Sequence, residues 1–206
     1  LRPEQVAPFI EAAKAWVNKH YPDIAHSPDY TRIINAKQYA RLVAMQKEAE
    51  QAGVQCLDLG TGASCPQDRV LLPQLLIEPP TDLRIMQEEI FGPLLPLLVY
   101  ENVDDALKGI NARPRPLALY VFGQEQEAMR EVLAHTRSGG VTVNDCLLHV
   151  TQHDLPFGGV GASGMGHYHG KFGFDTFSHQ RAVLNQSRWS SAGITQQKKK
   201  KKLTRL

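Results

Sequence analysis

Apolar residues recur at helical spacing near the start of the chain. Pro3 suits the first turn of a helix, and Glu4 suits its positive end. The apolar residues that share one helical face are Val6, Phe9, Ile10, Ala13, Trp16 and Val17. This pattern predicts an amphipathic helix over residues 3–20, ended by Tyr21-Pro22.

The same spacing returns between residues 35 and 52. Asn35 is a residue type that caps helix N-termini, and Gly53 is one that ends helices. One face of this predicted helix carries Tyr39, Leu42, Val43 and Gln46. A second helix is therefore expected over residues 35–52.

Beyond residue 53 the pattern changes to short apolar runs. Strands are predicted at 54–59 and 70–78, on either side of the turn-rich segment 60–64. The remaining elements, in order, are strand 94–100, helix 104–111, strand 117–122, helix 125–136 and strand 140–144. This alternation is typical of parallel βαβ units. The predicted fold class is α/β, with a mostly parallel sheet flanked by helices.

Charge is unevenly distributed along the 206 residues. The net charge is +2, but six of the 23 basic residues, Lys198–Lys202 and Arg205, lie in residues 196–206. The rest of the chain holds 17 basic and 21 acidic residues, a balance of −4. This distribution argues against a folded basic domain that binds nucleic acid, and residues 189–206 are expected to be a disordered basic tail without a specific nucleic-acid partner.

Cysteine content and hydropathy indicate where the protein works. Three cysteines, an odd number, are too few for a disulfide scaffold and indicate a reducing compartment. No apolar run approaches the roughly 20 residues that span a bilayer, and the first residues do not resemble a signal peptide. We expect a cytoplasmic protein without a membrane partner.

Residues 86–93 read Met-Gln-Glu-Glu-Ile-Phe-Gly-Pro. A carboxylate and an aromatic ring before a Gly-Pro turn, at the rim of an α/β sheet, can bind the hydroxyls of a ribose and a flat ring. The structural alternative is a capped helical turn with a core phenylalanine. The pattern by itself leaves both open.

The histidine and glycine patterns between residues 149 and 169 do not indicate a metal site or a dinucleotide loop. His149 and His153 have the spacing of a helical zinc pair, but their segment does not resemble a helix, so no metal site is expected and His153 is interpreted as a pocket residue. Residues 159–164 match G-x-G-x-x-G, but Pro156 precedes them and no helix is predicted after them. A dinucleotide loop is therefore rejected there. Cys146 follows a predicted strand without the partners of a catalytic triad.

Taken together, several blocks of sequence resemble the aldehyde dehydrogenase family, and most closely its class 3 and coniferyl aldehyde dehydrogenase branch. The resemblance covers roughly residues 1–188. Its blocks, in the order found in that family, are 86–93, 116–120, 138–145, 155–161, 163–166 and 176–178.

This resemblance implies NAD(P)-dependent oxidation of an aldehyde to a carboxylic acid, with an aromatic aldehyde of the coniferyl kind as substrate and NAD or NADP as cofactor. Glu89 matches the glutamate that holds the nicotinamide ribose, and Phe91 matches the aromatic residue packed near that ring. Asn144, His153 and Phe157 fall on segments that border the substrate pocket. The resemblance also implies a homodimer in the full-length enzyme.

The sequence also departs from the family. The nucleophilic cysteine, the general-base glutamate and the Gly-rich cofactor domain match no segment here, and are expected to lie upstream. We therefore expect a C-terminal fragment, inactive alone, with a partial catalytic domain (1–177), an edge strand for oligomerisation (178–188) and the tail (189–206). The alternative is a non-catalytic binding or scaffolding module that keeps the family fold.

Overall fold

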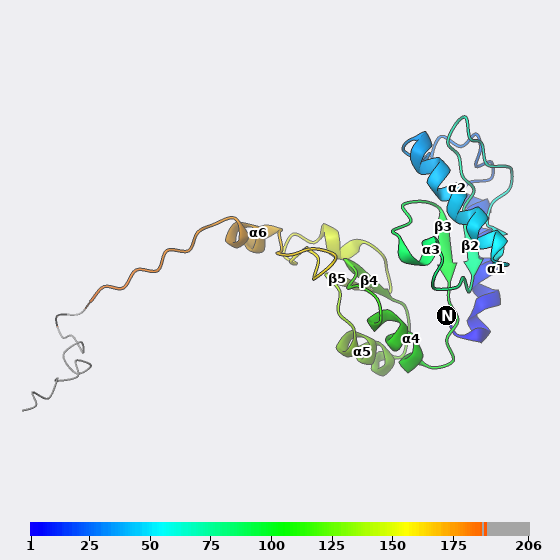
Figure 1. Cartoon of the computed structure of the whole chain (residues 1–206). Coiled ribbons are helices and arrows are strands. Elements are labelled where there is room, and N and C mark those ends of the chain that lie inside the picture. Colours follow the sequence, from blue (N-terminus) through cyan, green and yellow to red (C-terminus); the bar gives the residue numbers. More distant parts are fainter. Residues whose placement is uncertain (187, 189–206) are drawn as a thin grey trace, which may run out of the picture. The chain divides into compact units, whose positions relative to one another are not determined.

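The chain forms two compact units (Figure 1). The computed structural model describes residues 1–186 and 188. The first unit comprises Leu1–Arg113 and Glu125–Thr136, and the second comprises Pro114–Gln124 and the described residues after Thr136. The chain therefore passes between the units three times.

Two helices open the first unit and confirm the predicted periodicity. Helix α1 spans Pro3–His20, and its start is closed by the Arg2 amide, which donates to Gln5 Oε1 at 3.0 Å. Helix α2 spans Ala36–Gln51. The side chain of Asn35 accepts a hydrogen bond from the Gln38 amide, and Gly53 takes φ +79° just past the end, so both expected caps are present.

The sheet of the first unit has the order β1-β2-β3. Its strands are β1 (Gln55–Asp58), β2 (Gln74–Ile77) and β3 (Leu94–Leu97), and a short helix, α3 (Arg84–Gln87), lies in the connection from β2 to β3. β1 is antiparallel to β2, and β3 is parallel to it. The strand predicted over 70–78 is shorter because Leu72 donates its amide to Ser64 Oγ outside the sheet, and Pro73 has no amide hydrogen.

Both faces of this sheet are covered. Leu75 and Leu76 of β2 are fully buried and point to opposite sides. Leu76 belongs to a cluster with α2: Tyr39, Leu42, Met45, Ala49, Leu71, Ile85 and Leu94. Leu75 belongs to a cluster with α1: Val17, Ile24, Leu59, Val70 and Leu72. Ile90, in the loop after α3, also packs against the cluster that includes α2.

Helices α4 (Val103–Asn111) and α5 (Gln126–His135) complete the first unit. The side chain of Asn102 caps α4 by accepting a hydrogen bond from the Asp105 amide at 3.0 Å. Asn111 Nδ2 donates to the carbonyl of His135 at 2.7 Å, which joins the ends of the two helices.

The second unit contains a parallel pair, β4 (Ala118–Val121) and β5 (Gly140–Val143). A 3-10 helix, η1 (Leu148–Thr151), and helix α6 (Gly170–Thr176) follow. The α/β class and the parallel pairing are confirmed. The strands between 94 and 144 do not form one sheet, however, because β3 takes its ladder hydrogen bonds from β2.

The later predicted segments have different outcomes. Residues 178–186 adopt no helix or strand in this single chain. A strand exists only by pairing with a neighbour, so an edge strand over 178–188 stays a prediction about an assembly. The predicted tail, 189–206, lies outside the described residues. Within the described part, no helix combines the length and apolar character needed to cross a bilayer.

Candidate functional site

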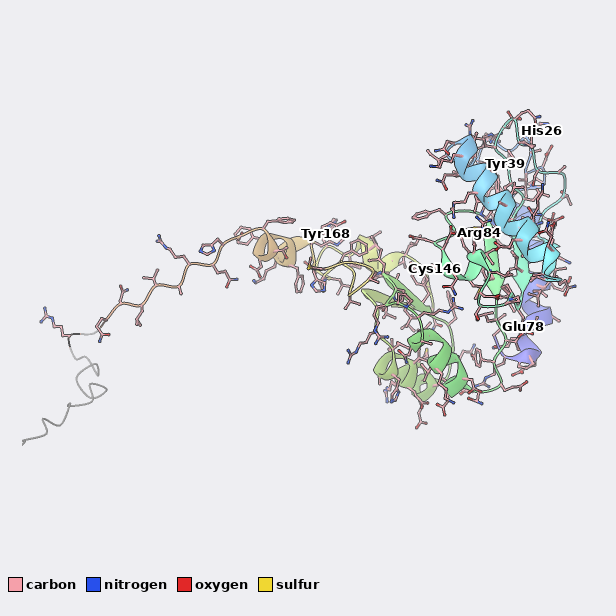
Figure 2. All side chains as sticks on the ribbon, in the orientation of Figure 1. His26, Tyr39, Glu78, Arg84, Cys146 and Tyr168 are labelled. Carbon is pink, nitrogen blue, oxygen red and sulfur yellow. The ribbon has the colours of Figure 1, made fainter. Side chains whose placement is uncertain are left out.

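The turn after α3 presents the two residues expected to bind the cofactor. Glu89 is exposed, and Phe91 as a residue is 77% exposed. The backbone of Phe91 lies in the left-handed region, with φ +47°. Tyr39 of α2 and Arg84 of α3, labelled in Figure 2, belong to the two helices that flank this turn. The alternative of a core phenylalanine is therefore wrong.

The side chain of Arg41, on α2, binds main-chain carbonyls of this turn. Its Nη1 donates to the carbonyl of Glu89 at 3.1 Å, and its Nη2 donates to the carbonyl of Ile90 at 2.5 Å. Nη1 also lies 3.7 Å from Glu88 Oε2, and Nε donates to Gln38 Oε1 at 2.7 Å. One guanidinium therefore joins α2 to three successive residues.

Gly92 lets the turn approach α2 closely. A Cβ atom at this position would lie 2.5 Å from Leu42 Cδ1 and 2.6 Å from Leu42 Cδ2. Because Leu42 is fully buried, its side chain has little room to move away. The glycine of the Gly-Pro pair is thus required by packing.

In the second unit, Asn144 joins the carboxyl ends of β4 and β5. It has φ +57°, its amide donates to Val121 at 2.8 Å, and its Oδ1 accepts a hydrogen bond from Gly123 at 2.9 Å. The carboxyl ends of parallel strands are where ligands bind in α/β folds. Asn144 is exposed at this end of the pair.

Phe157 and His153 lie in one cluster of aromatic rings. Phe157 stacks on His169, with ring centroids 5.6 Å apart and planes 18° apart, and it pairs with Tyr168 in an antiparallel bridge. His153 lies 5.9 Å from His169. Figure 2 shows Tyr168 on the segment that leads into α6. The structure therefore brings His153 and Phe157 together through His169.

His149 is a core residue and is only 7% exposed. Its Nδ1 lies 2.7 Å from Thr142 Oγ1, and its ring lies 6.1 Å from that of Tyr120 and 6.2 Å from that of Phe157. Its buried Nε2 has no hydrogen-bond partner. Among the described residues, no three histidine, cysteine or acidic side chains are placed to share a metal ion.

The glycine-rich loop lacks the context of a dinucleotide fingerprint. No strand leads into residues 159–164 and no helix opens from them. Gly158 and Gly159 instead allow backbone segments to approach, because a Cβ on either would lie 2.1 Å from a carbonyl oxygen, that of Gly166 or of Ser163. These glycines shape the loop that carries Phe157.

Comparison with known proteins identifies the family of this chain. The profile of the aldehyde dehydrogenase family matches residues 2–183. The chain belongs to the aldehyde dehydrogenase family. Over 188 residues it is 47% identical to a probable coniferyl aldehyde dehydrogenase of Pseudomonas aeruginosa, covering 91% of this chain and 39% of that relative. Over 177 residues it is 47% identical to mouse aldehyde dehydrogenase family 3 member A2, covering 85% and 35%.

Solved structures of aldehyde dehydrogenases also resemble this chain in fold. The substrate-bound AldH of Staphylococcus aureus superposes with a TM-score of 0.83 at 40% identity, covering 92% of this chain and 41% of that one. Aldehyde dehydrogenase C of Pseudomonas syringae, solved with NAD+ and octanal, gives a TM-score of 0.68 at 26% identity, covering 85% and 36%. The chain spans about two fifths of the length of these family members, so it holds part of the fold.

The predicted site residues fall into two groups. Glu89 and Phe91 belong to the first unit, whereas Asn144, His153 and Phe157 belong to the second. Sequence reasoning missed Arg41, Tyr168 and His169. The Arg41 contacts span 48 and 49 residues, so no local pattern could have revealed them.

Proposed function

We propose that this chain carries the nicotinamide-ribose contact of an NAD(P)-dependent aldehyde dehydrogenase. The observation that supports this most is the fixed turn, which exposes Glu89 and Phe91, two residues apart in sequence, away from the core. A carboxylate accepts hydrogen bonds from two vicinal hydroxyls, and an aromatic face packs on a flat ring. The carboxylate acceptor and the aromatic face of this turn therefore fit a nicotinamide riboside.

We further propose that Asn144, His153 and Phe157 border the pocket for an aromatic aldehyde of the coniferyl kind. With Oδ1 of Asn144 bound to Gly123, its Nδ2 remains a donor for an aldehyde oxygen. The ring cluster around Phe157 supplies an apolar wall. The bound cofactor would supply the hydride acceptor for the oxidation.

We propose that these 206 residues do not oxidise aldehydes by themselves, because none of their cysteines matches the family nucleophile. Burial raises the pKa of the Cys56 thiol, which opposes the reactive thiolate. Cys65 donates its thiol hydrogen to Asp68 Oδ2 at 3.4 Å. Cys146 lies just after β5, on the exposed turn (Figure 2). Reconstituted activity would then require the residues that carry the family's nucleophile and general base.

We also propose a cytoplasmic protein that assembles as a homodimer through residues 178–188. Three free cysteines are consistent with a reducing compartment. Exposed apolar side chains lie within this segment, at Val183 and Leu184, and directly before it, at Phe177. Exposed apolar side chains of this kind can pack against a second copy of the chain. Sedimentation of the chain as a stable monomer would contradict this assembly.

Nicotinamide mononucleotide provides the test of the cofactor proposal. Titration of the isotope-labelled chain should shift the amide resonances of Glu89 and Phe91, and Glu89→Gln should weaken binding. Removal of the exposed charge in Glu101→Gln should leave binding unchanged. Equal affinity in Glu89→Gln and the unsubstituted chain would refute the proposed contact.

A second assay addresses catalysis. The purified chain, mixed with benzaldehyde and NAD+, should produce no NADH above the rate of the mixture without protein. NADH formation would show that this chain does contain a working nucleophile. If the chain also bound no nicotinamide mononucleotide, a non-catalytic binding or scaffolding module would become the better interpretation.

A further inference from the structure

We propose that Arg41 is a positioning residue, which fixes the turn at residues 88–92 so that Glu89 and Phe91 face the nicotinamide riboside. This inference rests on the proposed function of that turn. The guanidinium would not touch the cofactor, because its nitrogens already donate within the protein, to the carbonyls of Glu89 and Ile90 and to the side chain of Gln38. Its role would be to hold the geometry.

The fork of an arginine suits these carbonyls. Nη1 and Nη2 lie in one plane and reach two acceptors on the same side, here the oxygens of Glu89 and Ile90. In an extended segment successive carbonyls point in opposite directions, so one guanidinium could not bind both. Binding of both oxygens therefore selects the turned backbone that precedes Phe91.

The turn depends strongly on this contact. In the described part of the chain, residues 89–92 make no hydrogen bonds between main-chain groups. Phe91 has a left-handed backbone conformation, which is energetically unfavourable for a residue with a bulky side chain. Such a conformation persists only where its surroundings enforce it. Arg41 on one side of Phe91 and the close packing of Gly92 on the other provide that enforcement.

Arg41 also distinguishes the two adjacent glutamates. The carboxylate of Glu88 lies 3.7 Å from Nη1, so its charge is paired with the guanidinium. Glu89 gives Arg41 only its carbonyl oxygen, and its side chain stays exposed. The carboxylate of Glu88 is therefore paired with Arg41 of α2, and the carboxylate of Glu89 stays available for a ligand.

Three variants of the full 206-residue chain test this role. Arg41→Gln removes the charge and the fork, whereas Arg41→Lys keeps the charge and loses the fork. The matched control is Arg32→Gln, since Arg32 donates to the carbonyls of Ser27, Tyr30 and Ala25 in another loop of the same unit. The readouts are the melting temperature, NMR order parameters of residues 89–92, and the affinity for nicotinamide mononucleotide.

In both Arg41 variants the order parameters of residues 89–92 should fall from about 0.85 towards 0.6. Affinity for nicotinamide mononucleotide should weaken by about tenfold, because the ligand must then order the turn. Arg32→Gln should lower the melting temperature without changing either quantity. If Arg41→Gln and Arg32→Gln lower the melting temperature equally, a loss of order and affinity in Arg41→Gln alone is due to lost positioning and not to lost stability.

The outcomes separate this inference from the proposed function. Unchanged order parameters in Arg41→Gln would overturn the positioning role, whatever the ligand does. Retained order in Arg41→Lys would show that charge suffices and would overturn the role of the fork. If Glu89→Gln weakens binding but Arg41→Gln does not, only the positioning role fails. If the unsubstituted chain binds no mononucleotide, the proposed function fails.

Discussion

Substitution of Gly92 by alanine probes the packing that holds the cofactor turn against α2. The added Cβ would lie 2.5 Å and 2.6 Å from the two terminal carbons of Leu42. Overpacking of a filled core costs about 1–3 kcal/mol. The backbone of Gly92 is not left-handed, so alanine also gains about 0.4–1 kcal/mol from a less flexible unfolded chain. From the middle of these two ranges, the expected net loss of unfolding free energy is about 1–2 kcal/mol.

Urea denaturation followed by far-ultraviolet circular dichroism measures this loss. The melting temperature should fall by about 2–8 °C, from about 2–4 °C per kcal/mol for a chain of this length. Gly109→Ala is the matched control, since nothing lies within 4 Å of its added Cβ inside α4. Because alanine favours helix, that control should gain about 1 kcal/mol.

A double-mutant cycle with Leu42→Ala tests the cause. Removal of the Leu42 side chain takes away the atoms that the new Cβ meets, so Gly92→Ala should then stabilise the chain by about 0.4–1 kcal/mol. The coupling free energy between the two sites should be about 1–3 kcal/mol. An equal cost of Gly92→Ala in both backgrounds, or a gain in the unsubstituted chain, would refute this explanation of the Gly-Pro turn.

Three further outcomes follow from the same structure. Burial raises the pKa of Tyr30 from 10.0 to about 12, so the stability it confers is complete below pH 10 and declines as pH rises from 10 to 12. After allowance for partial exposure the loss is about 1 kcal/mol, and Tyr30→Phe should remove this part of the pH dependence. Iodoacetamide at pH 8 should label exposed Cys146 before Cys56, whose pKa is raised by burial; mass spectrometry showing the reverse order would contradict this. Thr142→Val leaves Nδ1 of buried His149 without its partner and should cost about 1–3 kcal/mol in urea denaturation, whereas an unchanged midpoint would show that the contact adds nothing.

Local signals predicted the helices of the first unit well. Asn35 and Gly53 mark the two ends of α2 in the structure, as the sequence predicted. Such caps can be predicted because they depend on residues close in sequence. Strand limits were less accurate. The strand predicted over 94–100 ends at Leu97, since pairing with β2, whose last strand residue is Ile77, sets its length. Strand limits depend on a partner that local patterns do not include.

The candidate site shows the same division. Glu89 and Phe91 could be identified from one eight-residue block, but the left-handed backbone of Phe91 and its anchor, Arg41, required the fold. In the second unit, Phe157 was identified, whereas its stacking on His169 depends on a bridge across the glycine-rich loop. Residue types can be predicted from sequence, while their fixed orientation arises from contacts between distant segments.

The three passages of the chain between the units affect how the protein can be synthesised and divided. Helix α5 belongs to the first unit, although β4 of the second unit precedes it in the chain. During translation, the first unit therefore lacks α5 until residue 136 has left the ribosome, by which time β4 has already emerged. A single proteolytic cut after Arg113 would separate α4 from α5 and leave Asn111 without its bond to His135. The two units are therefore not domains that one cleavage or one gene truncation could separate intact.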